Sequence, residues 1–82
     1  MNPRVVSVHA RKNFTLELLF ENQEKRLFDA TPFLKKGLFK ELQNPEIFAT
    51  ASVFDGTVRW IHDQDLCPDT LYLHSHLIPK AS

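Results

Sequence analysis

Apolar and polar side chains alternate along the first third of the chain, which is the pattern of β-strands with one buried face. The clearest case is 14–20, where every second residue is apolar: Phe14, Leu16, Leu18 and Phe20. A similar alternation, with Val6, Val8 and Ala10 on one face, predicts a strand over 5–10, and a third strand follows at 24–29. Polar turns at 11–13 and 21–23 join them. Short links favour antiparallel neighbours, so residues 4–29 are predicted to form a three-stranded meander.

The alternation then gives way to short helical signals. Thr31-Pro32 can begin a helical turn that points Phe33 and Leu34 inward, and Gly37 can cap its end. A second short segment has helical spacing, with Leu38, Phe39 and Leu42 as its apolar residues. Asn44-Pro45 ends that segment, and a further turn is predicted over 45–48.

Residues 51–61 carry the strongest local signal, a β-hairpin. Asp55-Gly56 is a preferred two-residue turn. It sets a register that pairs Val53 with Val58 and Ala51 with Trp60, all on one face. A slip by one residue would expose Trp60, so burial of that ring is expected to fix the pairing.

The last segment predicts a terminal helix over 65–76. Asp65 suits its N-cap, and Pro68 suits its first turn. Pro79 ends regular structure, which leaves a frayed tail over 77–82. The fold class is therefore α+β, a single domain over 1–82 with an ordered core at about 4–76. About five antiparallel strands would pack with short helices.

Composition fits one small globular domain and narrows its partners. Hydrophobic residues make up 43% of the 82 residues and charged residues 24%. Ten basic and ten acidic side chains cancel, which disfavours a nucleic-acid binder. Residues 1–41 hold eight basic against five acidic side chains, and residues 42–82 hold two against five. Such polarity can orient a partner or simply maintain solubility.

The single cysteine, Cys67, cannot form an intramolecular disulfide, which favours a reducing, cytoplasmic location. No apolar run of signal-peptide length follows Met1. The longest fully apolar stretches have only three residues, as in Leu18–Phe20, so no membrane span is predicted.

Potential metal ligands gather near the C-terminal end of the sequence: His62, Asp63, Asp65, Cys67, His74 and His76. On a helix His74 and His76 would point about 200° apart and could not share one ion. On a strand they would share a face. A small metal- or ligand-binding protein is thus one alternative function, although no established metal motif is present.

Other chemistry finds less support in the sequence. Cys67 precedes Pro68 near the expected helix start, but neighbouring aspartates would oppose its thiolate. The two glycines do not form a phosphate-binding loop. Basic residues in turns of the first half offer a weak nucleic-acid site as a second alternative: Arg11, Lys12, Lys25, Arg26, Lys35 and Lys36. We therefore expect no catalytic residues, no cofactor and no enzyme activity.

Most large aromatic side chains are expected to form the core: Phe14, Phe20, Phe33, Phe39, Phe48 and Trp60. Few are left to line a ligand pocket. An open sheet has two edges, and the strands at 4–10 or 24–29 could occupy one. Because an edge offers unpaired backbone groups to another strand, a protein partner or a second copy is the favoured ligand.

The assembled residues resemble the bacterial family known as domain of unknown function 2442. The similarity covers about Val5 to Ser75 and is most specific in the run from Asp65 to Tyr72. Its signature residues are Phe20, Asp29, Gly37, Phe39, Phe48, Trp60, Asp65, Pro68, Leu71 and Tyr72. The glycine usual in the family's first turn is missing from Glu21–Glu24.

The resemblance implies an α+β fold and no established activity. It also suggests the antitoxin-like member of a small two-protein pair, because relatives are often encoded beside another small protein. The function expected from the sequence is therefore a non-enzymatic protein-interaction module.

Overall fold

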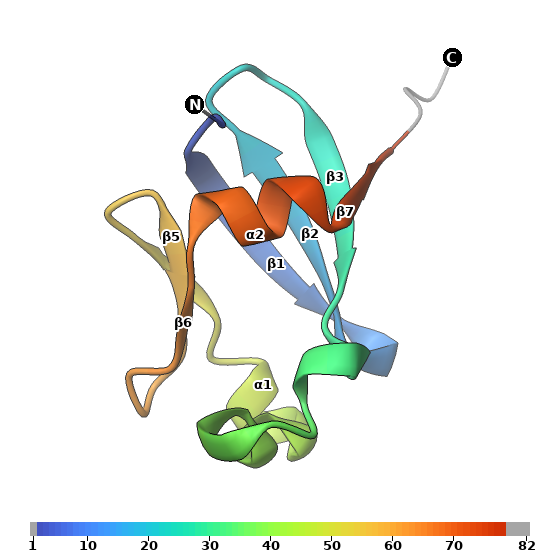
Figure 1. The fold of residues 1–82 in the computed structure, drawn as a ribbon, viewed down its shortest axis with the longest axis vertical. Coiled ribbons are helices and arrows are strands. Elements are labelled where there is room, and N and C mark those ends of the chain that lie inside the picture. The colour runs from blue at the N-terminus through green and yellow to red at the C-terminus, as the bar shows by residue number, and fades with distance from the viewer. Residues whose placement is uncertain (1, 79–82) are drawn as a thin grey trace.

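The computed structural model describes residues 2–78, which form two antiparallel sheets joined by short helical turns (Figure 1). The larger sheet has four strands in the order β1-β2-β3-β7, and the smaller one has the order β4-β5-β6. The α+β class is confirmed, with the strands divided between two sheets rather than forming one. No helix among residues 2–78 has the length and apolar character needed to cross a membrane.

The elements follow one another with short connections. The larger sheet consists of β1 (Val5–Arg11), β2 (Thr15–Phe20), β3 (Lys25–Asp29) and β7 (Ser75–Leu77). The smaller sheet consists of β4 (Ser52–Phe54), β5 (Thr57–Arg59) and β6 (Asp65–Leu66). The helical elements are η1 (Lys12–Phe14), η2 (Thr31–Phe33), η3 (Gly37–Gln43), α1 (Pro45–Phe48) and α2 (Pro68–Leu73).

The predicted N-terminal meander is confirmed, and its alternation buries Leu16, Leu18 and Phe20 of β2. One side of β1 differs from the prediction. A bulge between Val5 and Ser7 shifts the register, so Val5 is buried and Val6 is 54% exposed. A bulge places one extra residue in a strand, which reverses the face on which the preceding side chains lie.

The central segment forms the short turns that the sequence indicates. Helix α1 has the predicted bounds, and the side chain of Asn44 caps it by accepting a hydrogen bond from the N–H of Glu46. In η3 only Leu42 is buried, whereas Leu38 of the same apolar set is exposed. This segment is a 3₁₀ helix, in which side chains project at a different spacing from that of an α-helix.

The predicted hairpin register is confirmed, with Val53 opposite Val58. Both turn residues have positive φ, 50° at Asp55 and 81° at Gly56, as a type I′ turn requires. Trp60 is buried and donates a hydrogen bond from Nε1 to the carbonyl of Phe48, 3.0 Å away. The carbonyl of Gly56 accepts a hydrogen bond from the N–H of Val5, which joins the hairpin to the outer edge of β1.

The predicted helix over 65–76 is wrong at both ends. Asp65 pairs with Arg59 in the smaller sheet, and Cys67 rather than Asp65 precedes the first helical residue. The helix ends at Leu73, and β7 then pairs with β3. Leu77, expected in the tail, therefore lies in a strand, while residues 79–82 of that tail lie outside the described part of the chain.

The final strand also changes the edges of the sheet. Residues 24–29 do not form an edge, because β3 lies between β2 and β7. The edge strands of the larger sheet are β1 and β7. The first of these agrees with the prediction that residues 4–10 could form an edge. Helix α2 crosses one face of this sheet (Figure 1), and its Leu71 is fully buried there.

The aromatic side chains lie in or against the core, as expected. Phe20, Phe48 and Trp60 are buried, while Phe14, Phe33 and Phe39 are partly buried and pack against the buried cluster. The core thus extends from the four-stranded sheet to the hairpin, so the two sheets form one folded unit.

Replacing Gly56 by alanine should lower the free energy of unfolding by about 1–3 kcal/mol. A Cβ there would approach within 2.4 Å of Arg4 Nε and 2.9 Å of Arg4 Cβ, on a backbone with φ of 81°. Urea unfolding measures the change. Gly37→Ala is the matched control, since Gly37 has φ of 44° and no atom within 4 Å of the added Cβ. An equal loss in both variants would show that the contact with Arg4 contributes nothing.

Candidate interaction site

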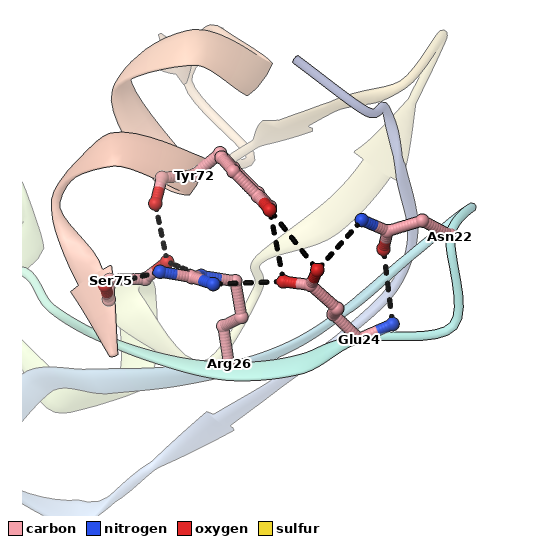
Figure 2. Close-up of polar contacts among 5 residues, drawn as sticks. All are labelled: Asn22, Glu24, Arg26, Tyr72 and Ser75. Carbon is pink, nitrogen blue, oxygen red and sulfur yellow. Dashed lines mark hydrogen bonds and ion pairs between the residues drawn. The ribbon is translucent and has the colours of Figure 1, made fainter. Parts of the chain in front are cut away.

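A partly buried polar cluster attaches the C-terminal segment to the larger sheet (Figure 2). Arg26 of β3 donates from Nε to Ser75 Oγ at 2.7 Å and from Nη2 to the Ser75 carbonyl at 2.9 Å. Its Nη1 forms an ion pair with Glu24 Oε1 at 2.8 Å. Tyr72 of α2 donates from its hydroxyl to the Glu24 carboxylate, and Asn22 donates to the same group. These contacts join β3, α2 and β7.

The position of Arg26 explains why the cluster is needed. Arg26 stands opposite Leu18 in β2, whose side chain is fully buried, so it lies on the inner face of the sheet. Only 17% of its side chain is exposed. A charge on such a face costs stability unless it is paired and hydrogen-bonded. Glu24 supplies the compensating negative charge. The Tyr72 ring stacks on the guanidinium, with its centroid 4.4 Å from Arg26 Cζ.

The cluster therefore determines where β7 lies. Ser75 is buried, and its hydroxyl also donates to the Tyr72 carbonyl. The ring of Tyr72 packs edge-on against Phe20 at 5.1 Å between centroids. With polar contacts on one side of Tyr72 and an aromatic contact on the other, α2 and the strand after it are held against β3.

The outer edge of β7 is left unpaired by every strand within residues 2–78. The Ile78 N–H donates to the Lys25 carbonyl at 2.8 Å, so backbone groups at 78 and, by alternation, at 76 point towards β3. The N–H and C=O of Leu77 consequently point away from the sheet. The side chain of Leu77 in this strand is 58% exposed, and that of Leu73, two residues before β7, is 67% exposed. We call this surface, formed by β7 and Leu73, the β7 edge.

The potential metal ligands are not brought together. His62 Nδ1 contacts the carboxylate of Glu41, His74 packs edge-on against Phe33, and His76 stands opposite Leu27 in the larger sheet. Asp63 forms an exposed pair with Arg59. Among residues 2–78 no group of three or more His, Cys, Asp or Glu side chains could hold a metal ion.

Cys67 is a free, exposed thiol beside the start of α2. Its Sγ lies 3.2 Å from Thr70 Oγ1. Hydrogen bonds from the Thr70 side chain and backbone lower the pKa of the thiol, and the Asp69 charge opposes them only weakly. Asp69 opposes the thiolate as expected from the sequence, but the hydrogen bonds from Thr70, which the sequence analysis did not consider, have the larger effect on the pKa.

The basic residues suggested for nucleic acid are dispersed. Arg26 is committed to the polar cluster, and Arg11 forms an exposed pair with Glu17. Lys25 lies in β3, while Lys35 and Lys36 are exposed between η2 and η3.

Most signature residues have a visible structural role. The buried signature residues are Phe20, Phe48, Trp60 and Leu71, and Phe39 packs against the buried cluster. Gly37 has positive φ, Pro68 begins α2, and Asp65 pairs in β6. Tyr72 joins the polar cluster, and Asp29 accepts hydrogen bonds from Thr31 at the start of η2. Sequence reasoning missed Glu24, Arg26 and Ser75 as a set. The available signal was Arg26 itself, a charged residue at an inward position of the alternating strand that contains Phe28.

Replacing Arg26 by methionine should lower the free energy of unfolding by about 1–3 kcal/mol, because Glu24 and Ser75 lose their partner. Hydrogen exchange at Ser75–Leu77 should accelerate more than exchange in β2. Arg11→Met is the matched control, since its exposed pair with Glu17 should contribute less than about 1 kcal/mol. Unchanged exchange in β7 of Arg26→Met would contradict the anchoring role.

Asp29 gives the fold a defined sensitivity to acid. Hydrogen bonds from the Thr31 hydroxyl and then from its N–H lower the pKa of Asp29 below its ordinary value of 3.8. The folded state thus prefers the carboxylate, and the stabilisation is present above about pH 4 and lost as pH falls through the lowered pKa. Asp29→Ala should destabilise by about 1 kcal/mol at pH 7. Thermal unfolding should show this difference from wild type narrowing towards pH 2; a constant difference would contradict it.

Comparison with known proteins agrees with the signature. The family described as "Protein of unknown function (DUF2442)" matches residues 5–76, nearly the whole described chain. No curated protein and no solved structure matches. The meander, the hairpin and the polar cluster all fall within the matched residues, and the chain belongs to this family of unknown function.

Proposed function

We propose that this protein is a non-enzymatic protein-interaction module that accepts a strand from a partner at the β7 edge. The observation that carries the proposal is the position of β7: Arg26 holds the strand through Ser75, and at Leu77 its outer backbone groups are unpaired by any described strand. A fixed edge with free backbone groups is what strand addition requires.

The side chains around the edge support an apolar partner strand. Leu77 and Leu73 are exposed large apolar residues of the C-terminal segment, and β7 contains no Lys, Arg, Asp or Glu. Main-chain hydrogen bonds would supply affinity, and these two leucines would favour alternate apolar residues in the partner. Because β7 has only three residues, the added strand would be short.

We further propose that the partner is the product of a neighbouring gene, with this chain as the antitoxin-like member of a cytoplasmic pair. The support for this extension is the family resemblance and the reduced, unpaired Cys67. The dispersed histidines and basic residues of the described chain give no comparable support to metal or nucleic-acid binding.

Leu77→Pro should abolish partner binding while the protein stays folded. Proline removes the Leu77 N–H, which points away from β3, so the ladder between β3 and β7 keeps its bonds. Co-expression with the neighbouring gene product, followed by pull-down, measures binding, and thermal unfolding checks the fold.

Ile61→Ala provides the control, because Ile61 is 63% exposed and lies outside the β7 edge. The edge could instead bind a second copy of the chain. Light scattering of the protein alone would detect such a dimer, and Leu77→Pro should dissociate it. Binding that survives Leu77→Pro in a folded protein would exclude the β7 edge as the interface.

A further inference from the structure

A concave surface lies at the C-terminal end of β1, between η1 and α1. It has a volume of about 570 Å³ and is lined by Ala10, Arg11, Lys12, Asn13, Phe14, Pro45, Phe48 and Ala49. We call it the η1–α1 hollow. Its lining is largely apolar, and the rings of Phe14 and Phe48 meet edge-on with their centroids 5.4 Å apart. The volume lies within the range of ligand sites.

The charge of the hollow has one sign. Two of its lining residues, Arg11 and Lys12, are basic, and none is acidic. Arg11 is paired with Glu17 at 3.4 Å, but both side chains are at least 40% exposed, so the pair is weak. Lys12 has no carboxylate within 4.0 Å among residues 2–78. An apolar surface with a free cation beside it complements a ligand that is apolar and anionic.

The turn that lines the hollow has an unfavourable backbone. Asn13 and Phe14 have φ of 65° and 58°, and a bulky residue rarely adopts such values. Two hydrogen bonds hold the turn: Thr15 Oγ1 donates to the Lys12 carbonyl, and the Ala30 N–H donates to the Phe14 carbonyl. Glycine would adopt this conformation without strain. Position 14 instead holds an aromatic ring that forms part of the hollow. Strained backbone of this kind is concentrated at functional sites.

The neighbouring strand favours a peptide over a small carboxylate. Ala10 and Arg11 belong to β1, which ends the larger sheet. Ala10 and Arg11 pair with β2 on one side. On the outer side of β1 the hairpin bonds to Val5 through Gly56, and no described strand pairs with Ala10 or Arg11 there. A chain lying in the hollow could therefore continue along the backbone of β1.

We infer that the η1–α1 hollow binds a peptide segment in which an apolar side chain stands next to carboxylates. The side chain would pack against Phe14, Pro45 and Ala49, which line the hollow and keep accessible surface, and the carboxylates would pair with Lys12 and Arg11. This site shares no residue with the β7 edge, so it is independent of the function proposed above.

Titration of the ¹⁵N-labelled full chain with three capped tripeptides tests the inference. The probes are acetyl-Glu-Phe-Asp-amide, acetyl-Lys-Phe-Lys-amide and acetyl-Glu-Gly-Asp-amide. Only the first should shift the amide resonances of Asn13, Phe14 and Ala49 in a saturable way below about 10 mM. Equal shifts from all three, or no shifts at the hollow, would overturn the inference.

Two charge-reversed variants separate the site from general electrostatics. Lys12→Glu should weaken binding of the first peptide by roughly fivefold. Lys36→Glu makes the same change at an exposed lysine outside the hollow and should leave affinity unchanged. Equal weakening in the two variants would show non-specific attraction and refute the site.

Discussion

The fold depends on keeping one cation compensated on the inner face of a sheet. Arg26 occupies an inward position opposite Leu18 of the neighbouring strand, and side chains from three elements surround it there. Glu24 comes from the preceding turn, Tyr72 from α2, and Ser75 from the last strand. A largely buried charge tolerates little rearrangement, because losing one partner leaves its desolvation penalty uncompensated and destabilises the fold. The arrangement of the C-terminal third follows from that requirement.

The same constraint connects structure with proposed function. A three-residue strand would contribute few ladder hydrogen bonds by itself, and β7 is instead held by side chains of its neighbours. The proposed partner strand would therefore add to an edge that intramolecular contacts already hold in place. Binding to a preorganised surface loses less conformational entropy than binding to a mobile one.

Local patterns in the sequence predicted the elements whose cause is local. Alternation placed β2 and β3, and Asp55-Gly56 fixed the hairpin register, because each signal lies within a few residues. The terminal helix was predicted too long for the opposite reason. Asp65 and Ser75 are strand residues only because Arg59 and Phe28 lie opposite them, and those partners are distant in sequence. The bulge between Val5 and Ser7 likewise has no signal in the alternation of β1.

The candidate sites were predictable only in outline. The sequence predicted a sheet with open edges, but β7 is one of those edge strands only because it pairs with β3. The η1–α1 hollow left a weaker signal, because Phe14 fits the alternation of β2 and was expected to be an ordinary core residue. Its positive φ arises from the turn that precedes the strand, and alternation contains no information about φ.

The order of the strands also has a consequence for synthesis of the chain. A ribosome releases the segments of the meander early, yet the neighbour of β3 is not made until residues 75–77 are added. Until then Arg26 cannot make its contacts with Ser75. A meander that formed before residues 75–77 were added would have β3 as its edge, so the strand open to pairing would differ from the one exposed in the finished molecule.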